Sequence, residues 1–216
     1  MYQKDYIIKM IKQLTLAVAT LLSSKSKTKI EECQQMLNGA IYDLTGMSEH
    51  TILKLSHRDL ISIISGGKEI NTEKCFALAE MLKLSAEVSE DDTARSFALY
   101  LKSLNIFIEV SLDQRSDTTQ NKSQAIHEII NVIKQYKLPK ESNLLIFRYY
   151  EFNGRYDKAE DVLFNMIKTN KDEIVDEGFA FYERLRMKTQ EELESGNLPL
   201  DEVIEGLNVY RNLLNH

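Results

Sequence analysis

Two stretches of this sequence come close to motifs of metal and phosphoryl-transfer sites. Residues 127–131 read H-E-I-I-N, with Asn131 where a zinc-binding H-E-x-x-H helix needs its second histidine. Residues 57–59 read H-R-D, the triplet of the protein-kinase catalytic loop, but Ile64 stands where the metal-binding asparagine is expected. We therefore interpret the first stretch as part of a helix with a surface histidine and the second as a helix cap.

Two further sets of polar residues each lack part of the phosphate or metal site that they resemble. Residues 65–68 read S-G-G-K, which is too short for a phosphate-binding loop, and Glu69 replaces the Ser or Thr that would hold magnesium. His50 and His57 could share a metal on one continuous helix, but Ser56 is expected to break that helix between them. The two histidines are therefore expected to be unrelated and exposed.

The carboxylates give no catalytic prediction either. Runs such as Glu90–Asp92 and Glu191–Glu192 fall at expected helix ends and on solvent faces. We find no pair whose apolar context would raise a pKa toward acid–base catalysis. The sequence thus predicts no catalytic residue, no metal site and no cofactor.

The composition favours an all-α fold. Among 216 residues there are only 2 Pro and 8 Gly, so helix breakers are scarce. No run approaches the roughly 18 apolar residues of a membrane span. A net charge of −6 argues against nucleic-acid binding, because phosphate contacts need clustered Lys and Arg.

The two cysteines indicate the redox state of the compartment in which the protein is expected to fold. Cys33 and Cys75 lie far apart at apolar positions of helical patterns, which predicts buried free thiols and a reducing cytoplasm. A cleaved secretory signal is the alternative, since Lys4 precedes the apolar stretch 14–22. The amphipathic pattern already begins at Ile7, and Lys9 and Lys12 interrupt its apolar residues, which disfavours a signal.

Hydrophobic periodicity divides the chain into a series of helices. Ser56 with Asp59 three residues later predicts a variant capping box at one helix start. Gly46, the Gly66-Gly67 pair and Gly154 predict helix ends or turns. The expected helices are 3–22, 28–44, 48–55, 57–65, 72–88, 92–112, 123–136, 140–152, 155–169, 173–195 and 200–214.

Residues 1–29 are predicted to form an N-terminal amphipathic helix and a polar linker, separate from a helical body of residues 30–216. Six lysines against one aspartate give residues 1–29 a charge of +5, which leaves −11 for the body. We predict an association helix and a possible homodimer; packing onto the chain's own body is the alternative. A membrane partner is not expected, because the apolar face lacks Trp and Phe. The face comprises Ile7, Met10, Ile11, Leu14, Val18 and Leu21.

A pattern of small and large apolar residues recurs after 34 residues in the second half of the chain. Four positions of one expected helix recur 34 residues later, which is the period of the tetratricopeptide helix–turn–helix repeat. Small and large apolar residues at these positions pack helix B of such a repeat against helix A. The pairs are Ala125 with Ala159, Ile129 with Leu163, Val132 with Met166, and Ile133 with Ile167.

Residues 143–166 resemble one tetratricopeptide repeat. Tyr150 falls at the family's tyrosine, Gly154 lies in the turn between the helices, and Ala159 is the small residue of helix B. The resemblance implies antiparallel hairpins stacked as a short right-handed array, clearest at about 94–170, with a concave groove lined by the A helices. Leu144, Arg148 and Glu151 would project into that groove, where Arg148 could bind a partner's carboxylate.

The opening residues 5–11, D-Y-I-I-K-M-I, followed by the helical body, also resemble a family of uncharacterised bacterial proteins. That resemblance covers the whole chain and brings no assigned activity.

These observations favour binding over catalysis. We expect a non-catalytic, cytoplasmic helical-repeat protein that holds a peptide or protein partner in a groove of helices 92–112, 140–152 and 173–195. One alternative is a small-molecule enzyme with a polar site between helices. Another is a regulatory subunit whose only ligand is its partner chain.

Overall fold

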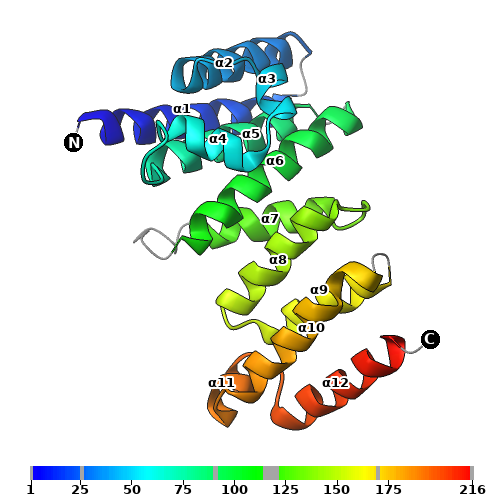
Figure 1. Cartoon of the computed structure of the whole chain (residues 1–216). Coiled ribbons are helices and arrows are strands. Elements are labelled where there is room, and N and C mark those ends of the chain that lie inside the picture. The colour runs from blue at the N-terminus through cyan, green and yellow to red at the C-terminus, as the bar shows by residue number, and fades with distance from the viewer. Residues whose placement is uncertain (1, 25–26, 90–91, 114–121, 169–170, 215–216) are drawn as a thin grey trace. The chain divides into compact units, whose positions relative to one another are not determined.

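The computed structural model describes residues 2–24, 27–89, 92–113, 122–168 and 171–214. Within these ranges every regular element is an α-helix, and there are twelve of them (Figure 1). The all-α prediction is therefore confirmed. The chain divides into two compact units, Met1–Lys137 and Leu138–His216, and each is described by itself.

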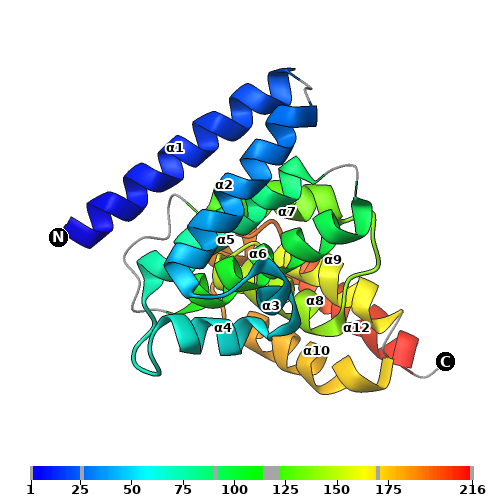
Figure 2. The same cartoon turned by 90° about the horizontal axis from the view of Figure 1, so that it is seen from above.

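The first unit is built around α5, which is apolar on nearly all sides. Eleven of its 17 residues are buried, as expected for a helix surrounded by others. α6 packs along it, and α1, α2 and α4 also contact it (Figure 2). The helices of this unit are α1 (Tyr2–Ser24), α2 (Lys27–Thr45), α3 (Glu49–Lys54), α4 (His57–Ile64), α5 (Thr72–Val88), α6 (Thr93–Leu112) and α7 (Ser123–Ile133).

The short helix α4 begins and ends where the sequence predicts. The Asp59 backbone N–H donates to Ser56 Oγ at 3.0 Å, which satisfies one of the unpaired donors at the helix start. Asp59 Oδ2 accepts from Ser56 Oγ at 2.7 Å, whereas a capping box would have that carboxylate accept from the Ser56 backbone N–H. Gly66 and Gly67 end the helix in the left-handed region, at φ 68° and 67°, where glycine has no steric penalty.

The second unit contains a helical hairpin followed by three more helices. α8 packs on α9, and Gly154 turns the chain between them at φ 67°. α10 then packs on α9, and α12 packs on α10 and α11. The bounds are α8 (Lys140–Phe152), α9 (Tyr156–Ile167), α10 (Lys171–Arg186), α11 (Gln190–Ser195) and α12 (Leu200–Leu214).

The single helix predicted at 173–195 is wrong, because the chain forms α10 and α11 there. Thr189 caps α11: its side chain accepts from the Glu192 backbone N–H at 3.2 Å. The Thr189 backbone N–H donates back to the Glu192 carboxylate at 2.9 Å. This reciprocal pair is a capping box, and it starts a new helix three residues after α10 ends.

The apolar positions that recur after 34 residues are mostly core positions in both α7 and α9. Ala125, Ile129 and Ile133 are buried on α7, and their counterparts Ala159, Leu163 and Ile167 are buried on α9. The fourth pair differs, since Val132 is 42% exposed while Met166 is 1% exposed. Contacts of α6 with α7, and of α8 with α9, give two helical hairpins in the predicted segment. Their assembly into one right-handed array stays a prediction.

The N-terminal helix α1 packs against α5 and α2 of its own unit. On its predicted association face, Leu14 and Val18 are buried, while Met10 and Ile11 are half-buried. The side chains of Ile7 and Leu21 lie outside the described residues. This arrangement matches the alternative that the helix covers the chain's own core, and its use in association stays a prediction.

Both cysteines are free and fully buried, as predicted. Burial raises the pKa of each thiol, that of Cys75 to about 11, so both are protonated and unreactive near neutral pH. Among the described helices none combines the length and apolar character that crossing a membrane requires.

Candidate functional site

The three predicted groove residues lie on α8, and two of them form ion pairs with α10. Glu151 and Arg184 make a two-point contact: Arg184 Nε donates to Glu151 Oε1 at 2.6 Å, and its Nη2 donates to Glu151 Oε2 at 2.9 Å. Beneath them, the rings of Phe147 and Phe181 meet edge to face with centroids 5.2 Å apart. α8 and α10 are thus joined by an aromatic contact inside the unit and by charges outside it.

A second acid extends the contact into a four-residue network. Glu177 Oε1 accepts from Arg184 Nη2 at 3.1 Å, and Glu177 Oε2 lies 3.7 Å from Arg148 Nη2. The hydrogen bonds that Arg184 donates to Glu151 raise the pKa of Arg184 above its usual value, so that guanidinium remains charged. We call Arg148, Glu151, Glu177 and Arg184 the α8–α10 charge network.

The two arginines of this network differ in how firmly they are held. Arg184 has two carboxylates at hydrogen-bond distance, whereas Arg148 has Glu177 at 3.7 Å and keeps 49% of its side chain exposed. Leu144, one turn before Arg148, is half-buried. The face therefore presents an exposed guanidinium beside an aliphatic side chain, which can bind a carboxylate with an apolar neighbour.

The sequence analysis missed Glu177 and Arg184 as members of this site. Both were placed inside one long helix, and their spacing of seven residues on one helical face was the available signal. The groove prediction itself draws on helices of both units, so it stays a prediction. The α8–α10 charge network belongs wholly to the second unit.

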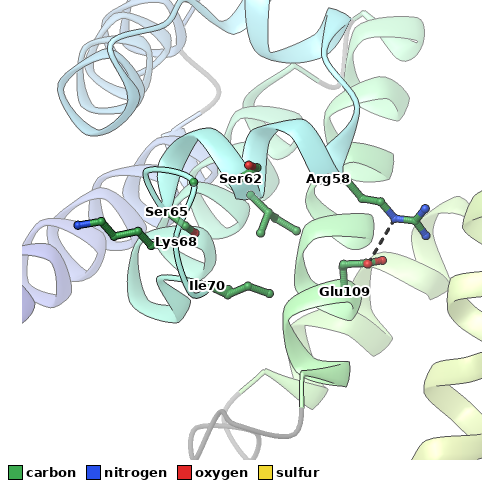
Figure 3. A pocket seen from close by; sticks show the side chains of 8 residues that line it. Arg58, Ser62, Ser65, Lys68, Ile70 and Glu109 are labelled. Carbon is green, nitrogen blue, oxygen red and sulfur yellow. Dashed lines mark ion pairs between the residues drawn. The ribbon is translucent and has the colours of Figure 1, made fainter.

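The first unit contains a pocket between α4, the turn after it, and α6. Its cavity volume is about 240 Å³, below the roughly 300–1,000 Å³ of sites for drug-sized ligands. The stretches H-R-D and S-G-G-K, which had been interpreted as a cap and a stop, both contribute to it (Figure 3). The lining residues are Arg58, Ile61, Ser62, Ser65, Gly67, Lys68, Ile70 and Glu109.

Glu109 on α6 is the acidic group of this pocket. Its Oε2 lies 3.4 Å from His57 Nε2, and its Oε1 lies 3.4 Å from Arg58 Nε. The hydrogen bond with His57 and the nearby Arg58 charge lower the pKa of Glu109, although partial burial opposes them. Glu109 is therefore an ionised carboxylate at neutral pH, with 28% of its side chain exposed.

The expectation that His57 is exposed is wrong. Its side chain is 2% exposed, because the first turn of α4 directs the ring toward Glu109 on α6 rather than toward solvent. His50 is exposed, as expected. Groups of three or more His, Cys, Asp or Glu side chains able to hold a metal are absent from the residues that the structure describes.

One carboxylate of the second unit is partly withdrawn from solvent and bonded to a buried tyrosine. Glu160 on α9 is half-buried, and Tyr182 donates to its Oε1 at 2.6 Å. Burial raises the pKa of Glu160, with smaller contributions from the charges of Asp161 and Glu202. Tyr182 is fully buried, so this pair lies against the core of the second unit.

Comparison with known protein families shows the family of this chain. Residues 1–215 match DUF6483, a family of unknown function. The chain belongs to this family. The match agrees with the resemblance of the whole chain to an uncharacterised family, and it assigns no activity to DUF6483 proteins. No curated protein matches the chain, and no solved structure does.

Proposed function

We propose that this member of DUF6483 is a non-catalytic, cytoplasmic binding protein that holds a peptide segment of a partner protein on the α8–α10 charge network. The observation that carries the proposal is Arg148, whose side chain is 49% exposed and whose Nη2 lies 3.7 Å from Glu177 Oε2. An incoming carboxylate can approach this guanidinium without first displacing a short ion pair.

The peptide should offer an acidic group for Arg148 and an apolar side chain for Leu144. Phe147 and Phe181 fix the spacing of α8 and α10 beneath the surface, and the Glu151–Arg184 contact holds its outer edge. A preformed surface costs less ordering on binding than a flexible one. The tetratricopeptide-like interpretation, in which A helices line a binding face, is part of the same proposal.

The test is a peptide array probed with the purified full-length chain. Bound peptides should be enriched in Asp, Glu or a free C-terminal carboxylate close to an apolar residue. Arg148→Glu should weaken binding of the selected peptides by at least about tenfold, since an attractive charge-assisted bond becomes repulsive. Arg211→Glu is the matched control, because it makes the same charge change at an exposed position of α12.

Two results would contradict the proposal. One is an array that yields no peptide with an acidic group. The other is a selected peptide whose affinity falls equally in the Arg148→Glu and Arg211→Glu variants, which would show attraction to net charge alone. Circular dichroism of both variants should match the wild-type spectrum, since both side chains are solvent-facing.

A further inference from the structure

The pocket between α4 and α6 offers a chemistry that the α8–α10 charge network does not. The side chains of Ile61 and Ile70 give it aliphatic walls. Glu109 stands at one end, while Lys68 points away from that end (Figure 3). Arg58 contacts Glu109 through its Nε and keeps 58% of its side chain exposed. Glu109 supplies the acidic group of the lining, to which Arg58 and Lys68 contribute basic side chains.

Glu109 retains capacity to accept further hydrogen bonds. An ionised carboxylate has about four lone-pair sites, and the contacts with His57 and Arg58 are both 3.4 Å long. His57, whose side chain is 2% exposed, contacts Oε2 of this carboxylate. The exposed side of Glu109 is thus available to a donor that enters the pocket.

We propose that this pocket binds a primary alkylammonium group, with the nitrogen donating to Glu109 and the alkyl chain lying against Ile61 and Ile70. A –NH₃⁺ group supplies three donors and no acceptor, which suits a carboxylate that is already ionised. The cavity of about 240 Å³ holds a short chain rather than a bulky molecule. Two sources share this chemistry: a free alkylamine or diamine, and the lysine side chain of a partner protein.

The size of the expected effect follows from the groups involved. A hydrogen bond to a charged group contributes about 1.5–3 kcal/mol, or roughly ten- to a hundredfold in affinity. Arg58 competes with the ligand for the same carboxylate. Removing Glu109 should therefore weaken binding, while removing Arg58 should strengthen it, and these opposite signs identify a cationic ligand.

The experiment titrates the full-length chain with butylamine, pentane-1,5-diamine and an N-acetylated, C-amidated lysine by isothermal calorimetry at neutral pH. Butanol and butyrate serve as neutral and anionic probes of the same length. Tighter binding of the two free amines indicates a small-molecule ligand, and tighter binding of the capped lysine indicates a partner's side chain. Either result supports the proposal.

Substitutions then decide whether binding occurs in the pocket. Glu109→Gln should weaken amine binding at least about tenfold, and Arg58→Ala should strengthen it. Lys54→Ala, at an exposed position of α3 outside the pocket, should leave it unchanged. If Glu109→Gln does not fold, Ile70→Ala provides the second test, because it shortens one aliphatic wall and should weaken binding of the longer amine.

Three results would overturn the proposal. They are the absence of calorimetric binding for every amine, stronger binding of butyrate than of butylamine, and amine binding that Arg58→Ala weakens. Stronger binding of butyrate would assign the pocket to an anion held by Arg58, and weakening by Arg58→Ala would show that Arg58 does not compete with the amine for Glu109.

Discussion

Replacing Gly178 on α10 by any larger residue should lower the free energy of unfolding, because the ring of Tyr210 occupies the space of a side chain there. A Cβ built at Gly178 would lie 2.1 Å from Tyr210 Oη and 2.2 Å from its Cζ. Tyr210 on α12 is fully buried and donates to the Ile174 carbonyl at 2.9 Å. Its ring also meets Phe179 at right angles, with centroids 5.5 Å apart. The ring therefore has little freedom to move aside.

The expected cost of Gly178→Ala combines three contributions. Overpacking of a filled core costs about 1–3 kcal/mol, and loss of the Tyr210 hydrogen bond adds about 1 kcal/mol. Replacing Gly by Ala inside a helix returns about 1 kcal/mol. We therefore expect Gly178→Ala to lower the free energy of unfolding by roughly 1–3 kcal/mol.

Denaturant unfolding followed by far-UV circular dichroism measures this change, and Gly39→Ala on α2 is the matched control. No atom lies within 4 Å of a Cβ built at Gly39, so that variant should gain about 0.5–1 kcal/mol from helix propensity. In a Tyr210→Leu background the Gly178→Ala cost should largely disappear, because the obstructing atoms are gone. Equal effects of the two glycine substitutions, or the same Gly178→Ala cost in both backgrounds, would refute the reasoning.

Three further changes test other parts of the structure. Thr189→Ala should cost about 0.5–2 kcal/mol in denaturant unfolding, since it removes a helix cap; an unchanged midpoint would contradict this. Burial gives Glu160 a pKa above its ordinary 4.5 in the folded protein, so ionising it opposes folding. Glu160→Gln should therefore gain stability relative to wild type as the pH rises above about 4.5, and a pH-independent difference would contradict it. Ile11→Asp with Leu14→Asp should lower the thermal midpoint, because Leu14 is 4% exposed; a dimeric wild type that becomes a folded monomer in light scattering would instead identify an association helix.

Helices were predictable from the sequence where their signals are local. α6 follows from the periodicity of its apolar residues, and the start of α4 follows from Ser56 with Asp59 three residues later. The break before α11 was also readable, because Thr189 and Glu192 form the S/T-x-x-E pattern of a capping box. Continuous polarity across residues 188–192 concealed it, since the helical period alone does not show where one helix stops.

The site features that were missed depend on partners distant in the chain. His57 is buried because of Glu109, 52 residues later, and no local pattern joins the two. Glu160 is half-buried partly because α12 approaches it at Gly206, where a Cβ would lie 2.1 Å from Glu160 Oε1. Such close approaches arise from the packing of whole helices, which a single sequence does not encode locally.

The surroundings of Glu109 and Glu160 shift the pKa values of these two carboxylates in opposite directions. Glu160 has a raised pKa, which general acid catalysis uses, but its Oε1 already accepts from the buried Tyr182 at 2.6 Å. Glu109 lines a pocket, but its pKa is lowered by His57 and Arg58. A carboxylate held ionised in this way is suited to keeping a cation in place rather than to giving up a proton. The raised pKa and the pocket lining thus belong to different carboxylates, Glu160 and Glu109.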